Sequence, residues 1–276
     1  MELLFALFSF LSGAVVGSFL NVVAWRVPRG ESIIRPGSHC LKCGAPVKWY
    51  DNVPVLSWFV LKGRCRSCRE KFTFRYALVE LAAGLLFAGI ALNFGIGFTA
   101  FRYFLFVSLL ICAVLTDLDH WIILDSVSIG GAAAGVLLAV ADPAISALGS
   151  MAAAAGAFCL FLLIRFLSIQ ILRRKPGYTK APKGYEDEEE DFQGGMGWGD
   201  IKLAGMTGAF LGPSLTGVAL FAGFLIGAVV GTAVILHGRD RRVPIPFGPF
   251  LAAGAVFSVF LGEKIWMLYI TAGLNG

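Results

Sequence analysis

The sequence predicts an all-α polytopic membrane protein with about eight transmembrane helices and a small cytoplasmic four-cysteine zinc-binding domain. Of its 276 residues, 57% are hydrophobic and only 15% are charged, and the mean hydropathy is +0.77. Soluble domains carry about 25% charged residues. The apolar residues form runs long enough for a bilayer, which takes about 20 residues per helix. The basic residues gather in loops that would lie on one side of the membrane.

The apolar runs divide the chain into eight expected spans. They cover residues 3–23, 76–98, 100–117, 126–142, 145–168, 201–213, 215–236 and 248–271. The sixth run is short and ends at Gly212-Pro213. The first 23 residues carry Glu2 where a secretory signal has basic residues, and residues 13–24 show no small-residue cleavage pattern. We therefore expect the first run to remain as a membrane span.

The basic residues indicate the orientation of these spans. Eleven of the 23 Lys and Arg residues lie in residues 24–75, six in 165–200 and three in 237–242. Together with Lys202, 21 of the 23 basic residues then lie on one side of the membrane in the eight-span arrangement. Basic loops stay in the cytoplasm, so we expect these loops there and both chain ends on the periplasmic side. The net charge of +5 then reflects membrane orientation and does not indicate nucleic-acid binding.

Residues 24–75 are too polar to span a membrane and contain the pattern C-x2-C-x21-C-x2-C. Two C-x-x-C turns can direct four sulfurs toward one tetrahedral zinc ion. The stretch between them is slightly longer than the usual zinc-ribbon spacing. Two disulfides are the alternative, which a reducing cytoplasm disfavours. The pattern predicts a structural zinc site with the ligands Cys40, Cys43, Cys65 and Cys68.

Two aspartates fall on the same membrane face in this topology. Asp117 ends the third span, and Asp200 begins the sixth, after a glycine-rich stretch. An ionisable residue at membrane depth costs about 2.5–3.5 kcal/mol, so such residues line a polar cavity or pair with each other. Two facing carboxyl groups share a proton; the charged one can activate water while the protonated one supports a carbonyl oxygen. The sequence therefore predicts that Asp117 and Asp200 form an aspartyl-type hydrolytic pair.

The remaining acidic residues are expected to have no catalytic role. Asp119 and Asp125 have loops close by and should be interfacial residues that reach water. Residues 169–199 form a charged connection whose acidic run, 186–191, is typical of a solvated loop. Attraction of a basic substrate tail is the alternative for that run.

Six segments along the chain point to one family: residues 17–33, 49–58, 75–80, 116–125, 195–212 and 245–254. They contain the cysteine domain's Trp-Tyr-Asp-Asn stretch, a D-x-D-H sequence at Asp117 and a G-x-G-D sequence at Asp200. Over nearly its whole length, the chain resembles the bacterial type IV prepilin peptidases. These are bifunctional leader peptidases and N-methyltransferases of pilus and type II secretion systems. One departure is Leu124, where the family usually has proline; proline supplies no catalytic group, so we expect altered rigidity without loss of activity.

The resemblance implies a membrane aspartyl protease of the G-x-G-D type, with Asp117 and Asp200 as its catalytic residues. It implies prepilin and pseudopilin precursors as substrates, with a basic leader, a glycine before the cut and an apolar helix after it. It also implies methylation of the new N-terminal residue from S-adenosylmethionine. Binding residues for this donor stay unassigned, with residues 49–52 and Glu80 as candidates.

The same resemblance implies a multi-pass protein of the bacterial inner membrane with its active site at the cytoplasmic face. We expect a first transmembrane helix at 1–23, a cytoplasmic zinc-binding domain at 24–75 and a transmembrane peptidase core at 76–276, which contains the cytoplasmic loop 169–199. Membrane lipid and the precursors are the expected partners, without nucleic acid. The oligomeric state is left open.

Three other functions are compatible with parts of the sequence. The first is a peptidase alone, in which the zinc domain is only a scaffold. The second is a transporter or proton relay that uses Asp117 and Asp200, although transporters place such acids near the bilayer midplane between broken helices. The third is a zinc-dependent hydrolase, which needs an open coordination position that four cysteine ligands do not leave.

Overall fold

The computed structural model of the chain describes residues 1–172, 196–237 and 245–274. Within these ranges all extended regular structure is helical, with two isolated β-bridges beside it, so the predicted all-α class is confirmed. The chain divides into two compact units, Met1–Thr116 and Asp117–Gly276. The acidic run 186–191 lies outside the described residues.

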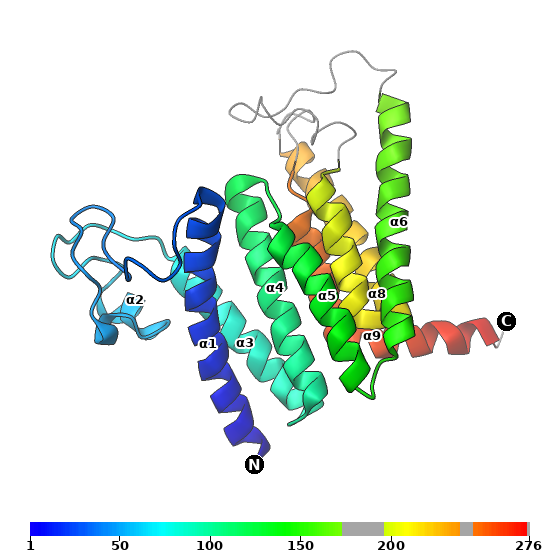
Figure 1. Ribbon diagram of the computed structural model, residues 1–276, viewed down its shortest axis with the longest axis horizontal. Helices are drawn as coiled ribbons and strands as arrows, with labels where there is room; N and C mark the ends of the chain where they lie inside the picture. Colours follow the sequence, from blue (N-terminus) through cyan, green and yellow to red (C-terminus); the bar gives the residue numbers. More distant parts are fainter. Residues whose placement is uncertain (173–195, 238–244, 275–276) are drawn as a thin grey trace. The chain divides into compact units, whose positions relative to one another are not determined.

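Helices α1 (Glu2–Arg26) and α3 (Arg75–Phe94) pack side by side in the first unit (Figure 1). Glycine allows this close approach, because a Cβ at Gly13 would lie 2.6 Å from the carbonyl oxygen of Ala83. Helix α4 (Phe98–His120) follows α3 after a short turn, and Phe87 stacks on Phe104 at 4.4 Å between ring centroids. The first unit is therefore built from small residues and ring stacking between apolar helices.

A small module follows α1 and precedes α3. It contains the 3-10 turns η1 (Val27–Arg29) and η2 (Trp49–Asp51) and the short helix α2 (Leu56–Val60). Its cysteine pairs lie in two separate tight turns.

The two cysteine turns repeat one hydrogen-bond pattern. The N–H of Gly44 donates to the carbonyl of Cys40 at 2.9 Å, and the N–H of Arg69 donates to the carbonyl of Cys65 at 3.0 Å. The residue after the second cysteine has a positive φ in both turns, 68° at Gly44 and 60° at Arg69. Glycine adopts this conformation without strain, whereas arginine does not.

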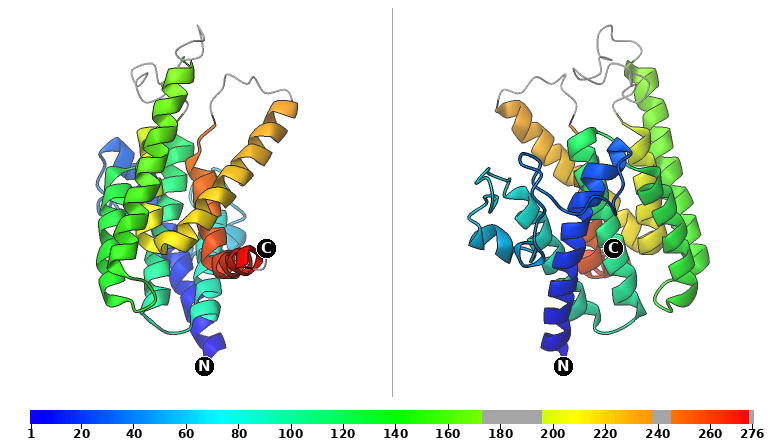
Figure 2. Two further views of the ribbon diagram at one scale, coloured as in Figure 1. Left: turned by 90° about the vertical axis from the view of Figure 1, so that its right-hand side faces the viewer. Right: turned by 60° about the vertical axis from the view of Figure 1, so that its left-hand side comes forward.

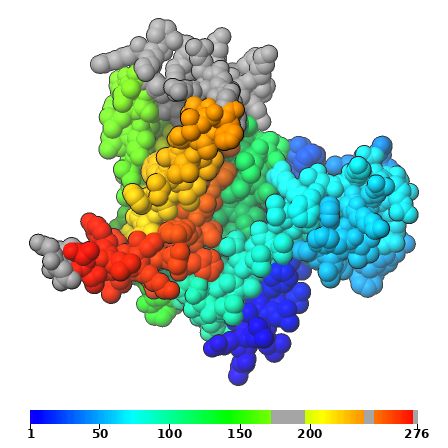
Figure 3. Space-filling view, turned by 180° about the vertical axis from the view of Figure 1, so that it is seen from behind, coloured from blue at the N-terminus to red at the C-terminus, as the bar shows by residue number. Residues whose placement is uncertain are grey.

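In the second unit, α5 (Asp125–Ala141), α6 (Ala147–Leu172) and α9 (Gly248–Leu274) each pack against α8 (Trp198–Leu236) (Figure 1). Glycines bring the helix backbones together at two of these contacts. A Cβ at Gly208 would clash with the backbone of Ala153, and one at Gly254 would clash with the carbonyl of Ala219. The rear view shows the first part of α9 beside α8, while the end of α9 extends away from it (Figure 3).

Helix α8 is bent in the middle, as Figure 2 shows. Its 39 residues would reach about 58 Å if straight, well beyond a hydrocarbon core of about 30 Å. Gly212 breaks the helical conformation with φ 71° and ψ −179°, and Pro213 follows it. The break falls where the sequence separates the sixth and seventh expected spans, so these two spans form the two halves of one kinked helix.

Among the described residues, six helices are long and apolar enough to cross a membrane, and α5 is a shorter apolar helix. With α8 divided at its kink, these helices correspond approximately to the eight expected spans. The cysteine module stands outside this set because its residues are mostly polar and exposed.

Candidate functional site

Asp117 lies near the end of α4 and is only 6% exposed. The backbone N–H of Gly248, the first residue of α9, donates to Oδ2 of Asp117 at 3.0 Å. A Cβ at Gly248 would stand 2.6 Å from the same oxygen, so glycine is required for this approach. The start of α9 therefore holds the Asp117 carboxyl group from a position 131 residues away in the sequence.

Asp200 lies in the first turn of α8 and is 8% exposed. Its carboxyl group turns back to the start of the helix, where the N–H of Gly197 donates to Oδ2 at 3.3 Å. Both aspartates are thus buried, and each accepts a hydrogen bond from the backbone at the start of a helix. Such N–H groups have no partner within their own helix.

Ile123, which is 7% exposed, links the surroundings of the two aspartates. A Cβ at Gly199 would lie 3.0 Å from Cβ of Ile123, and one at Gly248 would lie 3.4 Å from its Cδ1. The two carboxyl groups are close enough for their charges to interact. The structure therefore brings together the two aspartates that the sequence selects, and their catalytic role stays a prediction.

Asp125 has a partner that the sequence analysis missed. It is exposed at the start of α5, as expected, but its carboxylate forms an ion pair with Lys202. Lys202 lies two residues after Asp200, so the pair ties the N-terminal part of α8 to the first residue of α5. The sequence also contained no indication that the N–H of Gly248 donates to Asp117. Proline commonly stands in the first turn of a helix, so the proline after Gly248 is the local signal that a helix starts there.

The four cysteines of the module form a compact cluster. Their ligand atoms all lie within 4.8 Å of one another, and the Sγ atoms of Cys40 and Cys68 are 3.7 Å apart. Four sulfurs bound to one tetrahedral zinc at about 2.3 Å would lie about 3.8 Å apart. All six cysteines of the chain are free thiols. The cluster therefore fits a four-coordinate metal ion.

Hydrogen bonds act in opposite directions on two thiols of the cluster. Although the backbone N–H of Glu70 lowers the pKa of Cys68, desolvation and hydrogen bonds with the other three cysteines raise it to about 12. The backbone N–H groups of Cys43 and Lys42 lower the pKa of Cys40 to about 6. The thiolate thus favoured is the form that binds metal. Lys42 also pairs with Glu70, which connects the two cysteine turns.

The residues considered for a methyl donor have structural partners. Arg66 donates to both carboxylate oxygens of Asp51, at 2.7 and 2.5 Å, and this contact lowers the pKa of Asp51. The Glu80 carboxylate accepts the N–H of Val55 at 2.7 Å. Val55 has φ 64°, a strained value for a β-branched residue. These contacts give Asp51 and Glu80 a role in shaping the module.

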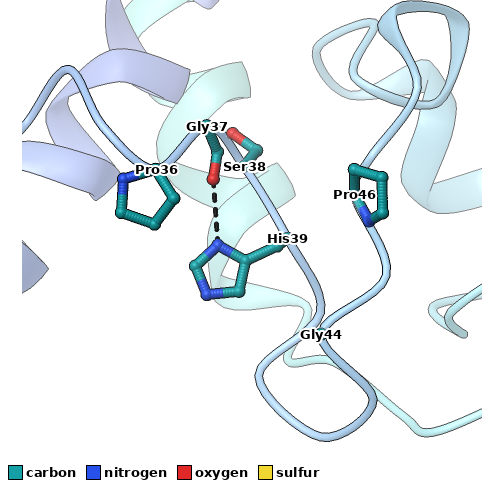
Figure 4. Close-up of a pocket in the computed structure, with 6 residues that line it drawn as sticks. All are labelled: Pro36, Gly37, Ser38, His39, Gly44 and Pro46. Carbon is teal, nitrogen blue, oxygen red and sulfur yellow. Dashed lines mark hydrogen bonds between the residues drawn. The ribbon is translucent and has the colours of Figure 1, made fainter.

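A hollow of about 290 Å³ lies beside the first cysteine turn (Figure 4). Proline and glycine form most of its wall, and the His39 ring is held by the carbonyl of Gly37 at 2.9 Å from Nδ1. Its described lining contains no carboxylate. The lining residues are Pro36, Gly37, Ser38, His39, Gly44 and Pro46.

Apolar spanning helices, two buried aspartates and a four-cysteine cluster define a polytopic membrane protein with a candidate aspartyl site. The chain belongs to the type IV leader peptidase family, whose profile matches residues 104–232. The bacterial Peptidase A24 N-terminal domain matches residues 11–94. With this membership, the helices identify a multi-pass membrane protein.

Its relatives include several proteins named prepilin leader peptidase/N-methyltransferase. The one from Myxococcus xanthus is 39% identical over 84% of this chain, and the match covers 64% of that relative's own length. The one from Bacillus subtilis is 31% identical over 96% of this chain and 98% of its own length. The one from Burkholderia pseudomallei is 32% identical over 97% of this chain and 88% of its own length. No solved structure matches the chain.

Proposed function

We propose that the chain cleaves the leader peptides of type IV prepilins and pseudopilins and then N-methylates the new N-terminal residue. The convergence of Asp117 and Asp200 around Ile123 carries the hydrolytic part of this proposal. The names of the relatives support both reactions. We assign Asp117 and Asp200 as the catalytic pair.

Hydrolysis by this pair needs one charged and one protonated carboxyl group. The charged one takes a proton from water, whose oxygen forms a bond to the scissile carbonyl carbon, while the protonated one donates to the carbonyl oxygen. The tetrahedral intermediate then collapses, the C–N bond breaks and the leaving amine gains a proton. Among the described residues, a Cβ at Gly197 would meet only the Asp200 carboxyl group and the N–H of Gly199 within 4 Å, so an extended substrate segment can approach Asp200 there.

The distribution of basic residues supports a location in the inner membrane. We infer that the active site faces the cytoplasm and that both chain ends face the periplasm. The inferred parts are a first span at 1–23, a zinc-binding domain at 24–75 and a peptidase core at 76–276. Precursors with a basic leader would then meet the aspartates from the cytoplasmic side.

We assign zinc to Cys40, Cys43, Cys65 and Cys68, where it would stabilise the fold of the module. S-adenosylmethionine supplies the methyl group in the second reaction. A peptidase with a purely structural module is the second candidate function, because the carboxylates near the module, Asp51 and Glu80, already have structural partners.

The test is a reaction of the purified protein with a purified prepilin in liposomes, followed by mass spectrometry with and without S-adenosylmethionine. We expect loss of the leader in both reactions and one added methyl mass only with the donor. A precursor with a bulky residue in place of the glycine before the cut is the substrate control. Absence of cleavage would refute the peptidase proposal, and cleavage that is never followed by methylation would leave the peptidase alone.

A further inference from the structure

Arg165 is a buried charge in the membrane-type helix α6. It is 6% exposed and lies in a segment that is otherwise apolar for several turns. Arginines within membrane-type helices usually pair with protein groups and often mark functional positions. The residues that Arg165 contacts therefore show what it does.

Arg165 contacts the start of α8 and the residues that lead into it at two points. Its Nη1 donates to the backbone carbonyl of Met196. Its guanidinium carbon lies 5.1 Å from the centre of the Trp198 ring, within the range of a cation–π interaction. The planar guanidinium can make both contacts at once, which an ammonium group does less well.

These two contacts enclose Gly197, the residue whose N–H donates to Asp200. Met196 and Trp198 are its neighbours on either side, so Arg165 holds the backbone carbonyl before this donor and the side chain after it. Glycine has no side chain to hold it in place, and its backbone is the most permissive of any residue. The position of the Gly197 N–H, and with it that of the Asp200 carboxyl group, depends on what holds its neighbours.

We propose that Arg165 is a positioning residue for Asp200, which acts through the Met196–Gly197–Trp198 backbone. The inference rests on the proposed function, because its consequence is measured in the cleavage reaction. Arg165 itself takes no part in proton transfer. A misplacement of about 1 Å in a catalytic group can cost about 100-fold in rate, so a backbone clamp of this kind is sufficient to control activity.

The alternative is that Arg165 only stabilises the packing of α6 against α8. The two roles differ in what they change. Loss of a purely structural contact lowers the amount of folded enzyme but leaves each folded molecule with its normal kcat and pH profile. Loss of a positioning contact lowers kcat and alters the pH profile of folded enzyme, because Asp200 titrates in changed surroundings, while KM changes little.

The first test compares Arg165→Gln and Arg165→Lys with the wild type, using full-length monodisperse protein in liposomes and kcat normalised to folded protein. We expect about a 10- to 100-fold fall in kcat for the glutamine variant, a shifted pH profile and a KM within about threefold. The lysine variant retains a donor and a charge but lacks the planar guanidinium, so it should recover only part of the rate.

Arg102→Gln is the matched control. Arg102 is also a buried arginine, 2% exposed in α4, and it also lies against an aromatic ring, that of Tyr103 at 4.7 Å. It stands near the opposite end of α4 from Asp117. We expect its replacement to affect the yield of folded protein but to leave kcat per folded molecule and the pH profile unchanged.

Trp198→Leu keeps the inference testable if Arg165→Gln does not fold, because Trp198 is 43% exposed and its loss leaves no buried hole. This variant should lower kcat by several fold with a pH shift in the same direction. Where both single variants fold, the double variant should be no worse than Arg165→Gln alone, because the two residues act through one contact.

A normal kcat and pH profile in folded Arg165→Gln or Trp198→Leu would overturn the inference and leave the proposed function intact. Additive losses in the double variant would also overturn it. A wild type that never cuts a prepilin would instead refute the proposed function.

Discussion

The cysteine cluster and the aspartate site assemble distant residues in different ways. In the cluster, two short turns with the same hydrogen-bond pattern each present a pair of sulfurs, and the surrounding residues are largely exposed. At the aspartate site, the groups come from single residues on α4, α8 and α9, and both carboxyl groups are buried. The first region depends on local turn geometry and a cation, whereas the second depends on how helices pack.

The largest expected effect on the cluster is that of Cys40→Ser. Three remaining thiolates cannot complete the tetrahedral site, so we expect the variant to release zinc and to lose order over residues 35–72. Metal analysis together with limited proteolysis measures this. Cys159→Ser is the control, because Cys159 lies in α6 outside the cluster and its loss should keep zinc at full stoichiometry. Full zinc content in Cys40→Ser would refute the ligand assignment.

At the aspartate site, Gly248→Ala should show how strongly activity depends on helix packing. The new Cβ would stand 2.6 Å from Oδ2 of Asp117, so either α9 or the carboxyl group must move. We expect the cleavage rate to fall about 10- to 100-fold while zinc content is unchanged. Gly231→Ala is the control because its Cβ would meet no atom within 4 Å, and it should keep the normal rate. Equal rates for the two variants would show that the start of α9 does not position Asp117.

The smallest expected effect concerns the difference between the two cysteine turns. Arg69 holds a φ of 60°, where its counterpart in the first turn is Gly44. Arg69→Gly should therefore raise the stability of the module by about 1 kcal/mol, because the left-handed conformation costs an ordinary residue about that much. Gly44→Ala should lower it by a similar amount. Thermal unfolding of the zinc-loaded protein measures both, and a loss of stability in Arg69→Gly would show that the arginine side chain matters more than its backbone strain.

The difference between local turns and packed helices explains which features the sequence could predict. The cysteine spacing indicates a metal cluster directly, because each turn is encoded within a few residues. Asp117 and Asp200 could be proposed from charge placement and motif, and Gly212-Pro213 marked the break in α8. The contacts of Gly248 with Asp117, of Arg165 with Met196 and of Lys202 with Asp125 could not be predicted, since they join distant residues that share no spacing pattern.

The proposed hydrolysis depends on both aspartates. The most direct test measures prepilin cleavage by zinc-loaded Asp117→Asn and Asp200→Asn, with Asp142→Asn as the control. Asp142 is also a buried aspartate, 2% exposed, but it lies at the opposite end of α5 from Asp125. We predict at least about a 1,000-fold loss in the first two variants, as expected for groups that act as a unit, and a normal rate in the third. Cleavage near the wild-type rate by either Asp117→Asn or Asp200→Asn would show that this pair does not perform the hydrolysis and that other residues carry it.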